Sequence, residues 1–97
     1  MANNKRGATH IPRYIISVAS KLVGAPPHTL RTYERADLIA PSRTEGNVRL
    51  YSDADIDILR RIVELSEQGV NLAGIKIILQ MEGLISGNGT DRETEDG

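Results

Sequence analysis

Apolar residues recur at helical spacing early in the chain and predict two short helices. Ser17 can cap the first helix, and Gly24 can end it, because glycine readily adopts the left-handed conformation that follows many helices. The apolar side of this helix comprises Val18, Ala19, Leu22 and Val23. Pro27 then begins a second helix without a side-chain cap, because proline lacks the N–H that a cap would satisfy. Two helices joined by a tight glycine-containing turn have the spacing of a helix-turn-helix.

The second helix, residues 26–35, is expected to have one polar, basic face opposite a single apolar anchor. At about 100° per residue, Leu30 points away from that face, and Thr29 and Tyr33 lie on its flank. The polar sector contains His28, Arg31, Thr32 and Arg35. This pattern fits an ordinary solvated amphipathic helix as well as it fits a DNA-recognition helix. The choice between the two interpretations therefore depends on the neighbouring elements.

A small β-hairpin is predicted after Pro41, a residue that excludes further helix before it. Two short β-capable runs flank a turn at residues 45–47, as in many hairpins. Alternate residues of a strand point to opposite faces, so Arg49 and Tyr51 share one face. With Arg43 and Arg49 on its two arms, directly after a helix-turn-helix, the hairpin indicates a wing whose arginines reach backbone phosphates. The alternative is a hairpin without a role in binding.

A third helix begins at a capping box, in which Ser52 and Asp55 bond reciprocally through side chain and backbone. Its apolar stripe continues to Gly69, which ends the helix. The stripe consists of Ile56, Leu59, Ile62 and Val63, widened by Ile58 and Leu65. Asn71 can cap a fourth helix that runs from Leu72 to about Ile85.

The fourth helix carries two apolar stripes on nearly opposite sides. The first, Leu72, Ile75 and Leu79, can close the core, and the second comprises Ile77, Met81, Leu84 and Ile85. A lone domain of this size has no second core to cover the second stripe. Because exposed apolar stripes usually mark partner surfaces, we predict that the second stripe makes a homodimer.

Length and composition indicate one small domain with an aliphatic core, since 97 residues contain neither phenylalanine nor tryptophan. The absence of cysteine excludes disulfides and thiolate metal sites. No apolar run approaches the ~20 residues of a membrane span, and no signal peptide is recognised, so we expect a cytoplasmic, nucleoid-associated protein. We divide the chain into a flexible N-terminal arm (1–12), a DNA-binding domain (13–85) and a disordered acidic tail (86–97).

The charges are divided unevenly along the chain, although the net charge is only −1. Residues 1–51 hold eight basic and three acidic residues, a net of +5, whereas residues 52–97 hold four basic and ten acidic residues, a net of −6. This asymmetry predicts that a polyanion binds the first half of the chain and not the second.

Calcium binding and catalysis are poorly supported. The spacing of calcium-loop ligands is met by Asp53, Asp55, Asp57 and Glu64. Ile58, however, stands where the sharp turn needs glycine, and a helical stripe runs through the segment. His10 and His28 have neither metal-ligand spacing nor a catalytic partner. We therefore predict a protein that is not an enzyme, with no catalytic residues, no cofactor and no metal site.

Several motifs in fixed order resemble the winged helix-turn-helix domain of MerR-type regulators over about residues 14–82. They are Ile16-Ser17-Val18-Ala19, Thr29-Leu30-Arg31-Thr32-Tyr33-Glu34-Arg35, Pro41-Ser42-Arg43, Arg49-Leu50-Tyr51-Ser52 and Gly69-Val70-Asn71-Leu72-Ala73-Gly74-Ile75. Within the family the chain is most similar to heat-shock repressors of the HspR type, and its wing also resembles that of the glutamine-synthetase repressors. The resemblance implies a mainly α fold, a winged helix-turn-helix with a small β-hairpin wing and two following helices.

The resemblance further implies a dimeric transcriptional regulator that reads an inverted-repeat operator in double-stranded DNA, with helix 27–35 in the major groove. It implicates His28, Thr29, Arg31 and Thr32 in base contacts, Tyr33, Arg43, Arg49 and Tyr51 in backbone contacts, and Arg35 as a further DNA-binding residue. Relatives usually carry Gln or Tyr at position 32, so their operator need not be the operator of this chain. Asp37 stands where relatives have glycine, and we expect it to adopt the left-handed conformation at some cost.

The heat-shock resemblance implies a repressor of heat-shock or chaperone genes, with an Hsp70-type chaperone as co-repressor and no membrane partner. Two alternatives stay open: a nitrogen-metabolism repressor, and an architectural or protein-interaction module that uses the same fold. A regulator should prefer its operator over random DNA by ~10³ or more, and an architectural factor by far less.

Overall fold

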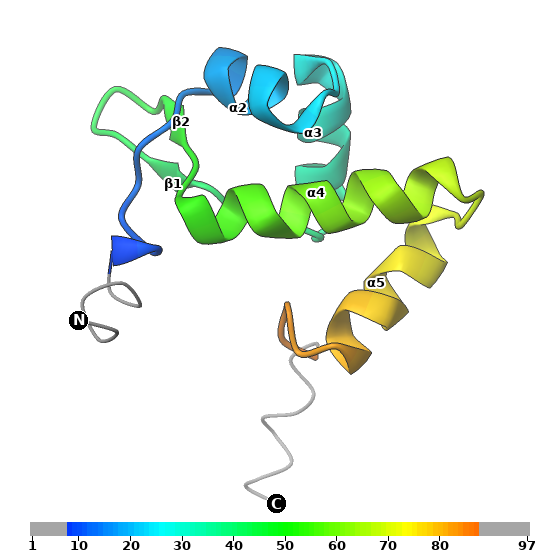
Figure 1. The fold of residues 1–97 in the computed structure, drawn as a ribbon. Coiled ribbons are helices and arrows are strands. Elements are labelled where there is room, and N and C mark those ends of the chain that lie inside the picture. The colour runs from blue at the N-terminus through cyan, green and yellow to red at the C-terminus, as the bar shows by residue number, and fades with distance from the viewer. Residues whose placement is uncertain (1–7, 88–97) are drawn as a thin grey trace, which may run out of the picture.

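The structure is a computed structural model in which residues 8–87 are described. Within that part, the helices are α2 (Ile16–Val23), α3 (Pro27–Arg35), α4 (Asp53–Glu67) and α5 (Leu72–Met81), and the strands are β1 (Ser42–Arg43) and β2 (Arg49–Leu50). α2 and α3 lie across one side of α4, and the hairpin projects beyond the helices near the start of α4 (Figure 1). α5 leaves from the other end of α4. This arrangement confirms the predicted winged helix-turn-helix with two following helices.

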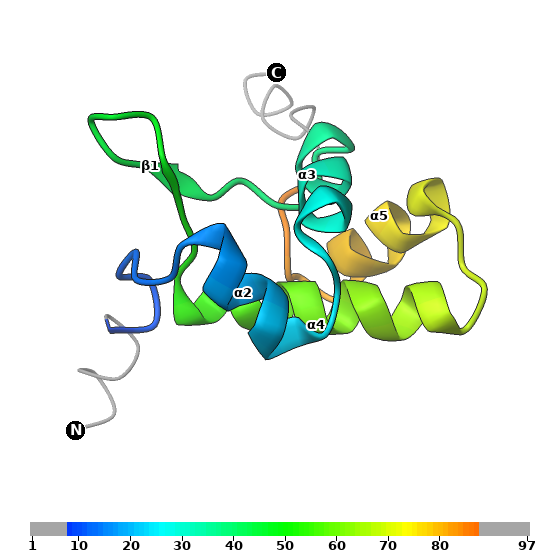
Figure 2. The ribbon, with the colours of Figure 1, turned by 90° about the horizontal axis from the view of Figure 1, so that it is seen from above.

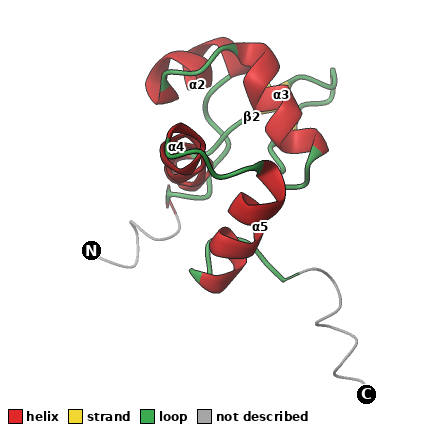
Figure 3. Ribbon diagram, turned by 90° about the vertical axis from the view of Figure 1, so that its right-hand side faces the viewer, coloured by secondary structure: helices red, strands yellow, loops and turns green. Residues whose placement is uncertain are grey.

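The core lies around α4, with α2 and α3 on one side of it and α5 on another (Figure 3). It is aliphatic apart from Tyr33 and Tyr51. The fully buried aliphatic side chains include Leu30, Leu38, Leu59, Ile62, Ile75 and Leu79. Burial of each such side chain stabilises the fold by about 1.5–3 kcal/mol, and Leu30 is the residue that anchors α3 in this core.

Local sequence signals mark the starts of three helices. In the capping box, the Asp55 N–H donates to Ser52 Oγ at 3.0 Å, and the Ser52 N–H donates to the Asp55 carboxylate at 2.9 Å. Asn71 caps α5 and accepts the N–H of Gly74 at 2.9 Å. Pro27 begins α3 without a side-chain cap. These three predictions are confirmed.

The predicted start of α2 is wrong, although its end is correct. The helix begins one residue before Ser17, and the carbonyl of Ile15 accepts N–H bonds from the third and fourth residues after it at 3.0 Å. Ser17 therefore lies inside the first turn and makes no cap. Gly24 ends the helix at φ 75°. Of the expected apolar side, Ala19 and Val23 are buried, whereas Val18 and Leu22 are 40% and 41% exposed.

α5 ends at Met81 and not near Ile85 as predicted. Gly83 adopts a φ of 76°, and the N–H of Leu84 donates to the carbonyl of Leu79 at 2.9 Å, so the chain turns back after the helix. Ile85 consequently lies outside the helix, where it packs against the core and lines a shallow pocket with residues 37–40.

Two non-glycine residues between positions 8 and 87 have positive φ angles. The hairpin pairs Ser42 with Leu50 and Arg43 with Arg49, and its turn passes through Asn47 at φ 68°. Asp37, directly after α3, has a φ of 64°, which confirms the left-handed conformation predicted for it. Asparagine and aspartate tolerate this conformation better than most residues, so both turns form without glycine at these positions.

The segment before α2 is bound to the junction of β2 and α4. Tyr14 and Tyr51 form an isolated antiparallel bridge with N–H to carbonyl distances of 2.9 and 2.7 Å. The Tyr14 hydroxyl donates to the Asp53 carboxylate at 2.6 Å, and Arg13 pairs with the same carboxylate at 3.1 Å. The N–H of Ala54 donates to the carbonyl at position 9 at 2.8 Å. Residues 1–7 of the predicted arm and 88–97 of the predicted tail lie outside the described residues.

Candidate nucleic-acid interface

α3 presents a polar face to solvent and buries its opposite side. Leu30 is fully buried and Tyr33 is 5% exposed, so these residues attach the helix to the core. The predicted base-contacting residues lie on the rest of the helix: His28 is exposed, and Thr29, Arg31 and Thr32 are half-buried. The exposed side chain of Arg35 ends the helix. The structure therefore gathers these residues on one short helix, as helical periodicity requires.

Hydrogen bonds order the end of this polar face. The Thr32 hydroxyl donates to the carbonyl of His28 at 3.1 Å and accepts from the Arg35 guanidinium at 3.3 Å. Within residues 8–87, Arg31 makes no side-chain hydrogen bond or ion pair. The guanidinium of Arg31 thus keeps all its donors available to a ligand.

Glu34 joins α3 to the wing by binding two arginines with one carboxylate, an arrangement we call the Glu34 bridge. Arg49 donates from Nε to one carboxylate oxygen at 2.6 Å, and Arg43 donates from Nη2 to the other at 3.0 Å. Arg43 also donates from Nη1 to the carbonyl of Asn47 at 3.3 Å. In the described part of the chain, Nη1 and Nη2 of Arg49 make no hydrogen bond, and this side chain is 25% exposed.

The charges of the Glu34 bridge favour ionised Glu34. Partial burial raises the pKa of this carboxyl, but the hydrogen bonds and positive charges of Arg49 and Arg43 outweigh that effect, so the pKa lies below its usual value. The bridge is therefore intact at neutral pH. It neutralises part of the wing's positive charge while leaving donors of Arg49 free.

Glu34 had no predicted role, because the sequence does not show which side chains meet between α3 and the hairpin. The usable signal was a lone acid between Arg31 and Arg35 on a basic helix, followed by a hairpin with an arginine on each arm. Such an acid is expected to pair with a cation that lies close in space.

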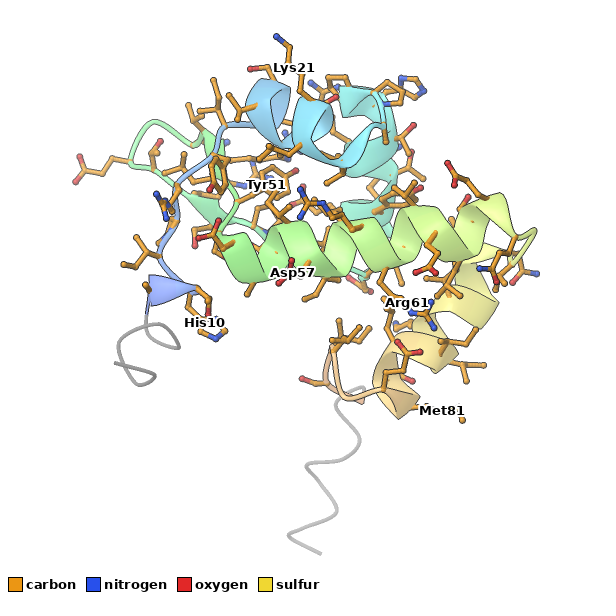
Figure 4. The ribbon with its side chains drawn as sticks, in the orientation of Figure 1. His10, Lys21, Tyr51, Asp57, Arg61 and Met81 are labelled. Carbon is orange, nitrogen blue, oxygen red and sulfur yellow. The ribbon has the colours of Figure 1, made fainter. Side chains whose placement is uncertain are left out.

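The tyrosine predictions need correction. Tyr51 is fully buried inside the molecule (Figure 4), and its hydroxyl has no hydrogen-bond partner among residues 8–87. The side chain of Tyr51 points into the core, although that of Arg49 on the same face is partly exposed. The predicted phosphate contact of Tyr51 is therefore wrong. Burial also raises the pKa of Tyr51. Tyr33 is 5% exposed, so only the rim of this side chain is accessible to DNA.

A second surface lies on α5, away from the wing. Ile77, Met81 and Leu84 of the predicted second stripe are 56%, 79% and 38% exposed, and Met81 lies at the outer end of α5 (Figure 4). Ile85 is half-buried in the pocket described above and does not belong to this exposed stripe. The prediction of one helical stripe through Ile85 is therefore wrong, because α5 ends at Met81 and both Leu84 and Ile85 follow the turn at Gly83.

Residues 8–87 contain no group of three His, Cys, Asp or Glu side chains that could hold a metal ion. Asp53 and Asp55, considered above as calcium ligands, are bound by Arg13 and Tyr14 and by the capping box, respectively. In the same range no helix is long and apolar enough to cross a membrane.

Comparisons with known proteins agree with this geometry. The family model for MerR HTH family regulatory proteins matches residues 14–82. A Streptomyces coelicolor protein that carries the name heat shock protein HspR is 49% identical over 76 residues, which cover 77% of this chain and 50% of that protein. The HTH-type transcriptional regulator GlnR of Bacillus anthracis is 39% identical over 82 residues, which cover 84% of this chain and 61% of that protein.

A solved structure is also similar to this chain. The crystal structure of a MerR-family transcriptional regulator from Bacillus cereus matches it with a TM-score of 0.65 at 26% identity, over 86% of this chain and 60% of that one. The chain spans 50% and 61% of the two curated relatives named above. The similar proteins are transcriptional regulators and not enzymes. The matched segment contains the whole helix-turn-helix, the wing and the two following helices, and the chain belongs to the MerR family of helix-turn-helix regulatory proteins.

Proposed function

We propose that this protein is a repressor that binds an inverted-repeat DNA operator as a dimer and controls heat-shock or chaperone genes. The observation that carries the proposal is the polar face of α3, whose Arg31 is unpaired within residues 8–87, beside a wing that retains guanidinium donors free in the same range. An arginine in the major groove can bind guanine through two hydrogen bonds. The 49% identity to HspR, against 39% to GlnR, favours the heat-shock assignment.

In this proposal α3 contacts bases and the wing contacts backbone phosphates. Base contacts are assigned to His28, Thr29, Arg31 and Thr32, and phosphate contacts to Arg35, Arg43, Arg49 and the rim of Tyr33. The net charge of +5 over residues 1–51 supports this division, because phosphate contacts depend on positive charge and position the protein on the duplex.

Selection of bound sequences from a random DNA pool tests the proposal. We expect an inverted repeat whose half-sites lie one helical turn or a multiple apart, because a two-fold dimer presents two copies of α3. The selected operator should bind ~10³-fold or more tightly than random DNA. Recovery of no consensus contradicts an operator-binding repressor and supports the architectural alternative.

We also propose an Hsp70-type chaperone as co-repressor, on the basis of the family resemblance. Ile77, Met81 and Leu84 are exposed apolar residues of the kind that a chaperone binds. In an operator titration, purified chaperone should tighten binding by a coupling of ~1–3 kcal/mol. An unchanged affinity, together with a shift on adding glutamine synthetase, would assign the protein to the nitrogen-metabolism repressors.

A further inference from the structure

We propose that Glu34 is a positioning residue that sets DNA specificity by holding the wing in register with α3. The inference rests on the proposed function, since it concerns one DNA-binding surface made of α3 and the wing. Glu34 belongs to the same helix as Arg31, yet among residues 8–87 its carboxylate binds only wing residues. Glu34 therefore links the helix that carries the base contacts directly to the two wing arginines.

The Glu34 bridge leaves Arg49 ready to bind a phosphate. Arg49 uses Nε for the bridge, so Nη1 and Nη2 remain as a pair of donors that can bind phosphate oxygens in parallel. A free arginine side chain samples many rotamers, and ordering it on binding costs free energy. Glu34 restricts Arg49 before DNA arrives, which favours binding in one geometry.

Both ends of the bridge are attached to buried aromatic residues. Glu34 follows Tyr33, which is 5% exposed, and Arg49 lies two residues before Tyr51, which is fully buried. Neither backbone segment can move without disturbing the core. The bridge therefore connects two fixed points, and the wing cannot shift freely relative to α3 while it is intact.

The same carboxylate weakens binding to DNA of any sequence. Non-specific binding depends mainly on positive charge, and Glu34 lowers the net charge around Arg43 and Arg49. Glu34 thus improves specificity in two ways, because it holds Arg49 in register for an operator and reduces the attraction of the wing for random DNA.

Glu34→Gln tests this inference, with Glu45→Gln as the matched control. Glu45 is an exposed acid in the turn of the same hairpin and makes no ion pair in the part of the chain that the structure describes. Both variants remove one negative charge near the wing, so both should bind random DNA more tightly. We expect only Glu34→Gln to lower the ratio of operator affinity to random-DNA affinity, by about fivefold or more.

Two further variants separate positioning from a general loss of stability. Arg49→Lys keeps the charge but lacks the separate Nε and Nη donors, so it should also lower the ratio, even if Glu34→Gln does not fold. In an Arg49→Ala background, Glu34→Gln should lower the ratio no further. An unchanged ratio in Glu34→Gln or Arg49→Lys, or an equal loss in Glu45→Gln, overturns this inference alone. A wild-type protein without operator preference overturns the proposed function as well.

Discussion

At the scale of single residues, the hydroxyl of Tyr51 is buried without a hydrogen-bond partner in the described part of the chain. Leaving such a group unsatisfied costs roughly 1–3 kcal/mol. We therefore predict that Tyr51→Phe raises the free energy of unfolding by about 1 kcal/mol, a rise in Tm of roughly 4–8 °C for a domain of this size. Thermal unfolding followed by circular dichroism measures the change. Tyr14→Phe is the control and should lower Tm, because its hydroxyl donates to Asp53 at 2.6 Å.

We expect recognition of one DNA base in each half-site to depend on the single side chain of Arg31. Arg31→Ala should weaken operator binding by ~1–3 kcal/mol and relax the preference at one base position in each half-site, because a bidentate contact with guanine is lost. Titrations of operator variants measure both effects. Arg60→Ala, which removes an exposed arginine from α4, should leave the base preference unchanged. An equal loss of affinity for operator and random DNA would show that α3 does not read bases.

At the scale of secondary-structure elements, Arg61 fixes the end of α5 to α4. Its guanidinium donates to both carboxylate oxygens of Glu82, at 2.9 and 2.5 Å, and it pairs with Glu64 at 3.0 Å. In Figure 4, Arg61 lies between the two helices. The hydrogen bond from Arg61 lowers the pKa of Glu82 below its ordinary 4.5. A carboxyl whose pKa is lower in the folded state than in the unfolded state stabilises the fold at pH values above its unfolded-state pKa. That contribution is lost as the pH falls through the folded-state pKa.

Glu82→Gln should therefore lower Tm at pH 7, and the difference from wild type should disappear as pH falls through the lowered pKa of Glu82. Melting curves at pH 7 and pH 3 provide the comparison. Glu67→Gln is the control, because Glu67 is exposed and makes no ion pair within residues 8–87. A pH-independent difference for Glu82→Gln would mean that packing, and not the ion pair, holds α5.

The elements were predictable where a few neighbouring residues determine them. Pro27, the capping box at Ser52 and the cap at Asn71 act within four residues, so the sequence alone placed these helix starts. The α5 end was missed because Gly83 and the packing of Ile85 against residues 37–40 override a continuing apolar pattern. The α2 start was missed because Ser17 is of a type that often caps helices, whereas α2 begins at Ile16 without a side-chain cap.

The candidate site shows the same difference between local patterns, which were predictable, and contacts between distant segments, which were not. Helical periodicity correctly grouped His28, Arg31 and Thr32 on α3. The Glu34 bridge depends on where the hairpin lies relative to α3, which no local pattern specifies. The inward orientation of Tyr51 likewise depends on which face of the hairpin meets the core.

At the scale of the whole molecule, the apolar stripe of α5 and the polar face of α3 belong to different parts of the surface. α5 runs away from α2 and α3 (Figure 3), and the wing projects beyond the helical body (Figure 2). A dimer joined through Ile77, Met81 and Leu84 would leave both copies of α3 accessible. The second stripe is therefore compatible with binding two half-sites at once.

We predict that Ile77→Glu combined with Met81→Glu gives a folded monomer, because two charges would have to be buried in the dimer. Operator binding should weaken by about 10²-fold or more, since the second half-site is no longer bound by a linked subunit. Analytical ultracentrifugation and operator titration measure the two effects. Val18→Glu, at an exposed apolar position of α2, is the control. A wild type that sediments as a monomer at all concentrations contradicts this dimer.

The contacts of Tyr14 with Tyr51 and Asp53 have a kinetic consequence. Tyr14 and Asp53 are 39 positions apart, and the intervening chain contains α2, α3 and the hairpin. Closing so long a loop costs more entropy than forming helix pairs that are neighbours along the chain, so we expect this closure late in folding. Since the closure fixes the base of the wing, partly folded chains should lack the complete binding surface. Such chains would then be unable to occupy an operator before folding is finished.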